Sequence, residues 1–263
     1  MTIIAGCDVG SLTSKAVIMQ QDKILAVEII KSKAKPQESA NLVLENALTK
    51  AGLKLPDVQF IVGTGYGRDH IPFVHKTMSE ISCHARGAKW LVPSAKTIID
   101  IGGQDCKVIK LDKTGNVSKF IANDKCASGT GRFLEVMARM MNISIQELGE
   151  VSEKSKQPIQ FASMCTVWAQ ADVVKYLNSG FALEDIGAGI NMAMANRVSM
   201  LVSAIGIETD ICMTGGVSKN SGVFVSLERI LGHKIKKARK LDPQLAGALG
   251  AALIANDQIK GRA

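Results

Sequence analysis

A strand–turn–strand pattern occurs twice in this sequence, with its two copies ninety-two positions apart. Each copy begins with an apolar strand that ends in an Asp-x-Gly turn, at Asp8 and at Asp100. A lysine follows each aspartate by seven positions, at Lys15 and Lys107. Because further strands follow in each copy, the pattern indicates a duplicated unit. Strands mixed with helices in two similar halves predict an α/β fold with one sheet per half.

Apolar residues at helical spacing predict the remaining elements. A first helix begins at Pro36 and ends at Gly52, where glycine can take the left-handed cap conformation. A last helix begins at Leu245. Thr77 and Glu80 form a predicted capping box at the start of a second helix, which ends before Pro93. The spacing predicts further helices near 130–141, 167–178, 186–205 and 221–231, and strands at 58–62 and 210–213.

Three glycine turns follow three predicted strands, at Asp8–Ser11, Asp100–Asp105 and Thr214–Val217. The chain has no Gly-x-x-x-x-Gly-Lys-Ser/Thr motif, so it is not a P-loop protein. Glycine lets backbone N–H groups approach phosphate oxygens closely, although a single glycine after a strand usually serves only the turn. Two Asp-x-Gly turns in a repeated unit, followed by a Gly-Gly turn, together indicate phosphate binding.

Polar side chains beside these turns are the candidates for holding phosphate and its counterion. Hydrated Mg²⁺ prefers a few carboxylates, which here are Asp8, Asp100 and Asp105. Lys15 either offsets phosphate charge or is an ordinary lysine on a strand. Gln104 and Gln244 either contact nucleotide or cap their own turns. Hydroxyl groups are offered by Ser11, Thr13 and Ser14.

The six cysteines include no Cys-x-x-Cys pair, so a self-contained zinc site is not expected. No secretory signal or membrane-spanning apolar run is apparent, which favours a reducing cytoplasm. Cys7 and Cys212 lie on predicted buried strands and are expected to be core residues. Cys83 and Cys106 receive no ligand role. The four histidines show no paired metal-binding spacing.

Two cysteines stand immediately before predicted helices. Cys126 lies in Asp124-Lys-Cys-Ala-Ser-Gly-Thr-Gly131, and Cys165 precedes Thr166, a candidate N-cap. Thiolates there would face unpaired backbone N–H groups at the positive end of a helix dipole, which suits phosphate or an anionic iron–sulfur cluster. Two thiolates cannot complete a four-cysteine shell, whereas a two-fold dimer would supply four. The alternative is that both are small buried hydrophobic residues.

The net charge of +8 does not by itself indicate nucleic acid, because the basic residues are spread along the chain. Only residues 234–240 form a modest basic cluster, and no nucleic-acid motif accompanies it. A solvated basic surface is the favoured interpretation, with an acidic protein or a nucleotide as the remaining alternative. Neither a nucleic acid nor a membrane is expected as a partner.

The two Asp-x-Gly turns and Thr214-Gly-Gly-Val217 resemble the superfamily of actin, heat-shock chaperone ATPases and sugar kinases. The sequence is more specifically similar to the activators of (R)-2-hydroxyacyl-CoA dehydratases, within the BadF/BadG/BcrA/BcrD type of ATPase. That resemblance covers essentially the whole chain. Its motifs are Gly63-Thr-Gly-Tyr-Gly-Arg68, Ser79-Glu-Ile-Ser-Cys-His84, Ile99-Asp-Ile-Gly-Gly-Gln-Asp105, Asn123-Asp-Lys-Cys126 and Gly247-Ala-Leu-Gly-Ala-Ala252.

The resemblance implies an actin-like ATPase fold, with two RNase H-like domains around a nucleotide cleft. The domains would be 1–94 plus 245–263, and 95–244. It implies ATP or ADP with Mg²⁺ held through water by Asp8 and Asp100. Catalysis would involve those two residues with Asp105 and Gln104. The nucleotide-binding residues would be Gly10, Ser11, Leu12, Thr13, Ser14, Lys15, Gly102, Gly103, Gln104, Gly215, Gly216, Val217 and Gln244.

It also implies a homodimer that shares one [4Fe-4S] cluster through Cys126 and Cys165 of each protomer. Such a protein takes electrons from ferredoxin or flavodoxin and passes them, with ATP hydrolysis, to a partner iron–sulfur dehydratase or reductase. Four positions depart from the usual activator pattern: Ser128, Trp168, Gln170 and Asp172. Ser128 leans toward the benzoyl-CoA reductase branch, and double-cubane cluster proteins are further candidate partners.

Two other classes of protein are alternatives to an electron-transferring activator. A small-molecule kinase needs a catalytic base and a substrate pocket, and the sequence has no motif for either. A non-redox actin-like ATPase would leave Cys126 and Cys165 idle.

Overall fold

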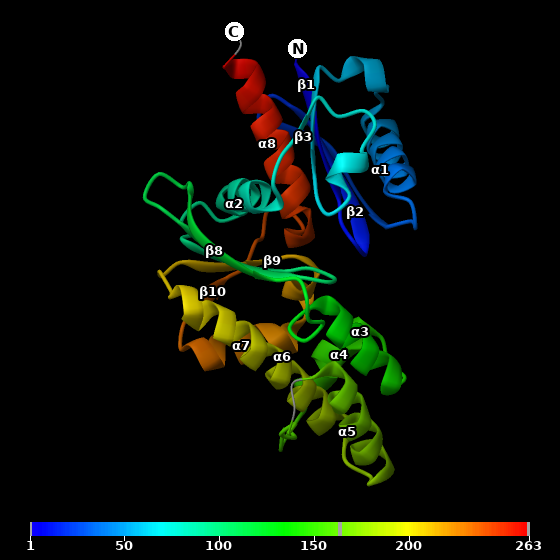
Figure 1. Ribbon diagram of the computed structural model, residues 1–263, viewed down its shortest axis with the longest axis vertical. Coiled ribbons are helices and arrows are strands. Elements are labelled where there is room, and N and C mark those ends of the chain that lie inside the picture. Colours follow the sequence, from blue (N-terminus) through cyan, green and yellow to red (C-terminus); the bar gives the residue numbers. More distant parts are fainter. Residues whose placement is uncertain (1, 163–164, 262–263) are drawn as a thin grey trace. The chain divides into compact units, whose positions relative to one another are not determined.

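The structure is a computed structural model that describes residues 2–162 and 165–261. These residues divide into two compact units. The first comprises Met1–Ala95, Leu111–Ser118 and Ala238–Ala263, and the second comprises Lys96–Lys110 and Lys119–Lys237. Each of the two sheets has five strands (Figure 1). The domain boundaries given above stay a prediction, from which these units differ mainly at residues 111–118 and 238–244.

The first sheet has the strand order β3-β2-β1-β4-β5. Strands β1 (Ile3–Val9), β2 (Thr13–Gln20) and β3 (Lys23–Lys31) pair antiparallel, as their short polar turns predict. Strands β4 (Phe60–Thr64) and β5 (Lys76–Thr77) continue the sheet in parallel. Strand β1 is buried along its whole length, which explains why it is a nearly continuous apolar run.

Alternate residues of β1 face different helices. Ile3, Ala5, Cys7 and Val9 belong to the core cluster that includes helix α1 (Pro36–Ala51). Pro36 stands at the start of α1, and Gly52 ends it with φ 68°, as predicted. The intervening residues of β1 face helix α8 (Ala246–Lys260), which also packs against α2 (Glu80–Leu91). This alternation places Asp8 on the α8 side of the sheet. The N-cap of α2 is Ser79, whose side chain accepts from Ser82 N, so the predicted capping box at Thr77 is wrong by two residues.

The second sheet has the strand order β10-β9-β6-β7-β8. Strands β6 (Thr97–Ile101) and β7 (Cys106–Leu111) pair antiparallel, and β8 (Val117–Asn123) forms the edge. Strands β9 (Ile211–Thr214) and β10 (Ile235–Lys236) continue it in parallel. Its helices are α3 (Gly131–Met140), α4 (Ile145–Ser152), α5 (Thr166–Asn178), α6 (Leu183–Ile205) and α7 (Ser221–Leu231).

Short 3₁₀ helices complete the described chain and mark several of its turns. They are η1 (Leu55–Asp57), η2 (Arg68–His70), η3 (Gly216–Lys219) and η4 (Pro243–Leu245).

The duplication predicted from the sequence is confirmed by the two sheets. Strands β1, β2, β3, β4 and β5 correspond in order and direction to β6, β7, β8, β9 and β10. Asp8 pairs in register with Lys15 across β1 and β2, and Asp100 pairs with Lys107 across β6 and β7. Asp100 also pairs with Thr214 across the parallel strands β6 and β9. The seven-residue spacing is therefore the signature of one hairpin used twice.

Four of the six cysteines are core residues. Cys7 and Cys212 are buried, as predicted, and so are Cys83 and Cys106. Burial raises the pKa of the Cys83 thiol to about 12, so it stays protonated at neutral pH. Cys126 and Cys165 are exposed, so the interpretation of these two as buried hydrophobic residues is wrong.

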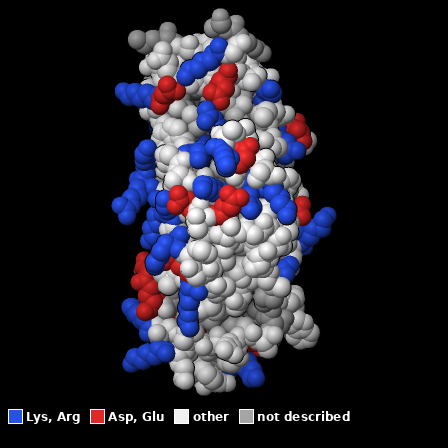
Figure 2. All heavy atoms as spheres, turned by 90° about the vertical axis from the view of Figure 1, so that its left-hand side faces the viewer, with Lys and Arg blue, Asp and Glu red and all other residues white. Residues whose placement is uncertain are grey.

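Basic and acidic side chains are interspersed on the face drawn in Figure 2, which also has a broad uncharged area. The basic cluster at 234–240 is largely used in local contacts. Lys234 pairs with Glu228 and Lys236 with Asp210, while Lys237 lies over the ring of Phe224. None of the helices in the described part combines the length and apolarity that a membrane span requires.

Helices α2 and α8 approach so closely that a side chain on Gly250 has no space. A Cβ atom built there would lie 1.8 Å from Cys83 O. We therefore expect Gly250→Ala to lower the free energy of unfolding by about 1–3 kcal/mol, because a well-packed contact must separate. Thermal unfolding measures this. Gly261→Ala is the matched control, since its Cβ would meet only Asp257 O at 3.4 Å. Equal midpoints for the two variants would contradict the close packing.

Candidate functional site

The first glycine turn joins β1 to β2 and is held by its own backbone and by Ser32. Gly10 N donates to Thr13 O at 3.2 Å, and Ser32 N donates to Leu12 O at 3.0 Å. Ser32 Oγ donates to Gly10 O at 2.7 Å and shares a 2.9 Å hydrogen bond with the hydroxyl of buried Ser14. Ser14 thus fastens the turn from inside. Ser11, by contrast, is exposed.

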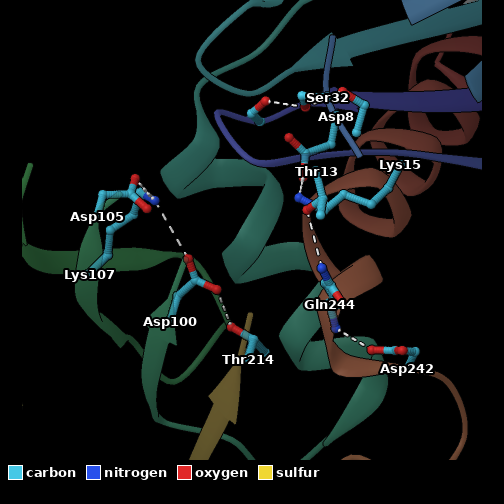
Figure 3. Close-up of polar contacts among 12 residues, drawn as sticks. Asp8, Thr13, Lys15, Ser32, Asp100, Asp105, Lys107, Thr214, Asp242 and Gln244 are labelled. Atoms are coloured by element: carbon cyan, nitrogen blue, oxygen red, sulfur yellow. Dashed lines mark hydrogen bonds and ion pairs between the residues drawn. The ribbon is translucent and has the colours of Figure 1, made fainter. Parts of the chain in front are cut away.

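Asp8, Lys15, Thr13 and Gln244 gather at this turn (Figure 3). Lys15 Nζ lies 3.1 Å from Asp8 Oδ2, and both side chains are largely buried. Gln244 Nε2 donates to Thr13 Oγ1 at 3.2 Å, across 231 positions of sequence. Asp242 Oδ1 accepts from Gln244 N at 2.9 Å and so fixes the start of η4. The structure therefore brings Gln244 to the first turn, where its polarity alone had left its role open.

The second glycine turn has the same backbone bond, from Gly102 N to Asp105 O at 3.0 Å. Asp100 is only 1% exposed, and each of its carboxylate oxygens has a partner. Thr214 Oγ1 donates to Asp100 Oδ1 at 2.8 Å, and Lys107 Nζ lies 3.5 Å from Asp100 Oδ2 (Figure 3). Lys107 also donates to the carboxylate of Asp105. Gln104 is exposed at the tip of this turn.

The third turn packs directly on the second. Gly215 has φ 83°, and a Cβ atom there would lie 2.2 Å from Ile101 O, so only glycine fits. Ser218 Oγ donates to Gly215 O at 2.6 Å, Gly216 begins η3, and Val217 is buried. The second and third glycine turns, predicted as separate motifs, are therefore in direct contact within the second unit.

Sequence reasoning gave no site role to Lys107, Thr214 or Ser32. Lys107 had a signal, because it repeats the spacing of Lys15. Thr214 was included only as the first residue of the third glycine turn, and Ser32 carried no signal because it lies on a different segment. Among the described residues, no group of three or more His, Cys, Asp or Glu side chains could hold a metal ion.

The loop that carries Cys126 is fastened by Asn123. Asn123 Nδ2 donates to Cys126 O at 2.9 Å and to Ser128 O at 3.1 Å. Thr130 then donates to Ala127 O through both its backbone N and its hydroxyl. Exposed Cys126 is therefore carried on a short, internally bonded loop that leads into α3.

The prediction of unpaired N–H groups at the start of α3 is wrong. Gly131 N donates to Gly102 O at 2.9 Å, and Arg132 N donates to Gly103 O at 2.8 Å. A Cβ atom on Gly131 would lie 3.0 Å from Gly102 O, so a larger residue would crowd this approach. The orphan donors of the helix are satisfied by the second glycine turn, which packs against them. Two hydrogen bonds therefore connect that turn to the helix behind Cys126.

Helix α5 begins differently. Its N-cap is Cys165, in extended conformation, whereas Thr166 is already helical, so the predicted Thr166 cap is wrong by one residue. Ala169 N donates to Cys165 O at 2.9 Å. Gln170 Nε2 donates back to Thr166 O at 3.2 Å. Cys165 therefore stands at the positive end of α5, as the dipole argument requires.

Apolar side chains next to Cys165 face outward. Val167 is 69% exposed and Trp168 is 66% exposed, and Val174 and Phe181 are also exposed. Only Ala169 and Val173 of α5 are buried. Large exposed apolar side chains on neighbouring positions indicate a surface that another protein covers.

The segment before Cys165 is held by Asp185, in the first turn of α6. Asp185 Oδ1 accepts from Ser155 Oγ at 2.7 Å, Lys156 N at 3.0 Å and Gln157 N at 2.9 Å. These hydrogen bonds, with that of Gln157 N the largest contribution, lower the pKa of Asp185. The carboxylate therefore holds the segment at all pH values above its usual pKa and releases it only as the pH falls through the lowered value.

We expect Asp185→Ala to speed limited proteolysis within residues 153–162 by roughly tenfold at neutral pH, because local opening is no longer opposed by three hydrogen bonds. Asp172→Ala, at a half-buried position of α5, is the control. Cleavage rates are followed by mass spectrometry. If both variants were cut as slowly as the unsubstituted protein, Asp185 would not be what holds the segment.

Comparison with known proteins agrees with the family resemblance seen in the sequence motifs. Residues 5–255 match the BadF/BadG/BcrA/BcrD ATPase family. The 2-hydroxyisocaproyl-CoA dehydratase activator of Clostridioides difficile is 44% identical over 256 residues, which cover 97% of this chain and 95% of the relative. The (R)-2-hydroxyglutaryl-CoA dehydratase activating ATPase of Acidaminococcus fermentans is 44% identical over 255 residues, covering 95% of each.

A solved structure agrees with the sequence comparison. The activator of the 2-hydroxyisocaproyl-CoA dehydratase from Clostridium difficile with bound ADPNP superposes with a TM-score of 0.95 at 44% identity. The match covers 99% of this chain and 97% of that chain. The fold is thus the two-domain actin-like ATPase fold expected from the repeated turns. On this evidence, the chain belongs to the BadF/BadG/BcrA/BcrD ATPase family.

Proposed function

We propose that this protein is an ATP-driven activator that delivers low-potential electrons to a partner 2-hydroxyacyl-CoA dehydratase. Relatives named as dehydratase activators match over nearly the whole chain, and one was solved with bound ADPNP. The observation that carries the proposal is the pair of hydrogen bonds from Gly131 and Arg132 to Gly102 and Gly103. They join a phosphate-type turn to the helix behind an exposed cysteine.

Cys126 and Cys165 would hold one [4Fe-4S] cluster together with the same two cysteines of a second protomer. Both thiols are exposed, whereas the other four are buried, so the donor set fits two ligands per chain. The apolar surface at Val167 and Trp168 beside Cys165 suits coverage by a second copy. When bound, such a cluster supplies one-electron transfer at a potential set by hydrogen bonds and solvent exposure.

The glycine turns would bind the nucleotide. Gly10, Gly102, Gly103, Gly215 and Gly216 allow close approach of the backbone. Lys15 would offset phosphate charge, while Asp8, Asp100 and Asp105 would hold hydrated Mg²⁺. Exposed Gln104 would reach the hydrolytic water, and Gln244 with Thr13 would contact the nucleotide from the first unit.

ATP can drive the transfer only if it binds one conformation more tightly than another. A displacement of Gly102 and Gly103 around phosphate would be passed to Gly131 and Arg132 by two short hydrogen bonds. The Cys126 loop precedes these residues directly, so it would move with them. The coupling is reciprocal, so occupation of the cysteines would also change nucleotide affinity.

The electron donor would be ferredoxin or flavodoxin, and the protein would work in the cytoplasm. The alternative is that the protein is the ATPase subunit of a benzoyl-CoA reductase, the branch toward which Ser128 leans, or the reductase of a double-cubane cluster protein.

Anaerobic purification tests the proposal. We expect a brown dimer with about two irons per chain, one four-iron cluster for each pair of chains. Activation of a dehydratase should require ATP and a reductant together. A colourless, iron-poor monomer that still hydrolyses ATP would overturn the electron-transfer role and leave the ATPase assignment intact.

A further inference from the structure

The first and second glycine turns have the same backbone hydrogen bond but carry different side chains at one equivalent position. Each turn is closed by a bond from its glycine N to the carbonyl three residues on, at Thr13 and at Asp105. Each is flanked by an Asp and Lys that face each other in register. The first turn carries a hydroxyl where the second carries a carboxylate.

This difference changes what lies over each glycine. A Cβ atom built on Gly10 would have Lys15 Nζ as its nearest side-chain atom, at 3.2 Å, with Asp8 Oδ1 farther away at 3.9 Å. A Cβ atom built on Gly102 would lie 2.3 Å from Asp105 Oδ1. The first turn therefore presents an ammonium group beside its glycine, and the second presents a carboxylate. An anionic phosphate is attracted directly to the first arrangement, whereas beside the carboxylate of the second it requires a cation between the two negative groups.

The ammonium group of Lys107 is used within its own unit. It contacts the carboxylates of Asp105 and Asp100, and Lys107 is only 5% exposed. Asp100 is fixed from its other oxygen by Thr214. Two carboxylates and one ammonium leave this group with a net charge of −1, whereas Asp8 and Lys15 balance each other. A single net negative charge on positioned carboxylates suits a hydrated divalent cation.

We propose that the two repeated lysines have different tasks. Lys15 faces phosphate, while Lys107 is a positioning residue that holds Asp100 and Asp105 for the magnesium ion accompanying the nucleotide. The inference deepens the nucleotide half of the proposed function. It does not depend on the cluster.

Two matched variants, Lys15→Met and Lys107→Met, separate the tasks. ADP affinity is measured by calorimetry in excess chelator and again over a range of Mg²⁺ concentrations, with ATP hydrolysis followed in parallel. We expect Lys15→Met to weaken ADP binding in chelator by roughly tenfold or more, the loss of one charge-assisted hydrogen bond.

Lys107→Met should leave ADP affinity in chelator within about twofold, since Lys107 makes no charge-assisted bond to phosphate. Its Mg²⁺ half-saturation should move to lower concentration, because the group gains a net negative charge. Its kcat should fall while KM changes little, and Lys107→Arg should recover part of that loss. A tenfold loss of ADP affinity in chelator for Lys107→Met would overturn the proposal, because Lys107 would then bind phosphate.

Because Lys107→Met leaves the carboxylates of buried Asp100 and partly exposed Asp105 without their shared cation, it can fail to fold. Asp105→Asn then serves instead: the half-saturation for Mg²⁺ should rise, and an unchanged value would equally overturn the proposal. All variants are prepared with their iron content and visible spectrum recorded. A failure here with normal iron refutes the role of Lys107 alone, whereas absent iron in every sample refutes the cluster assignment alone.

Discussion

Cys126→Ala is expected to abolish iron binding in the anaerobically purified protein. The substitution removes two of the four thiolates that a dimer offers, and a cube bound by only two is not retained. Iron should fall from about two per chain to near zero, together with the visible absorbance. ADP should still bind, with its affinity altered only by the lost coupling to the cluster, because the hydrogen bonds of Gly131 and Arg132 come from the backbone and stay in place.

Cys212→Ala is the matched control for this experiment. Cys212 is buried in the same unit and pairs within the second sheet. It should retain the full complement of iron, with at most a small loss of stability from the deleted sulfur. Full iron content in Cys126→Ala would show that the ligand assignment is wrong. Loss of iron in both variants would point to misfolding and not to ligation.

Asp100→Asn has the opposite profile: ATP hydrolysis is expected to fall by roughly 10²–10⁴-fold while iron is retained. Asp100 is the buried centre of the second turn, bonded to Thr214 and close to Lys107. An amide cannot hold hydrated Mg²⁺ as a carboxylate does, and it leaves Lys107 paired to Asp105 alone.

The matched control is Asp112→Asn, in the exposed hairpin turn between β7 and β8. Asp112 accepts hydrogen bonds from Thr114 and Asn116, which lower its pKa, but belongs to no glycine turn. Its ATPase rate should match that of the unsubstituted protein. Steady-state hydrolysis and iron analysis on the same samples decide the case. Hydrolysis by Asp100→Asn at the control rate would remove Asp100 from the catalytic set.

Much of this architecture was predictable because the same strand–turn–strand pattern occurs twice in the sequence. The Asp8–Lys15 and Asp100–Lys107 spacing fixes two antiparallel registers, and each register places a carboxylate and an ammonium on one face of its sheet. Cys126 and Cys165 were separable from the other cysteines because Cys7 and Cys212 lie within apolar strands. Helix starts and ends followed from residues such as Pro36 and Gly52, whose conformational limits are local.

The partners of the tertiary hydrogen bonds could not be predicted from the sequence. The N–H groups at the start of α3 were expected to face a thiolate, yet they bond to Gly102 and Gly103, which lie on another loop. The position of Gln244 at Thr13 and of Ser32 at Gly10 depends on distant segments meeting. The sequence shows that Lys107 repeats the spacing of Lys15. Only the structure shows that Lys107 pairs with Asp105 as well as with Asp100. Such tertiary hydrogen bonds leave no periodic trace in a sequence.

The central claim is that phosphate at the second glycine turn is felt at Cys126 through Gly131 and Arg132. It is tested most directly by the rate at which a chelator removes iron from the reduced, anaerobic protein with ADP and with a non-hydrolysable ATP analogue. The account predicts different rates, together with a nucleotide-dependent spectrum. Identical rates and an identical spectrum in both nucleotide states would contradict it.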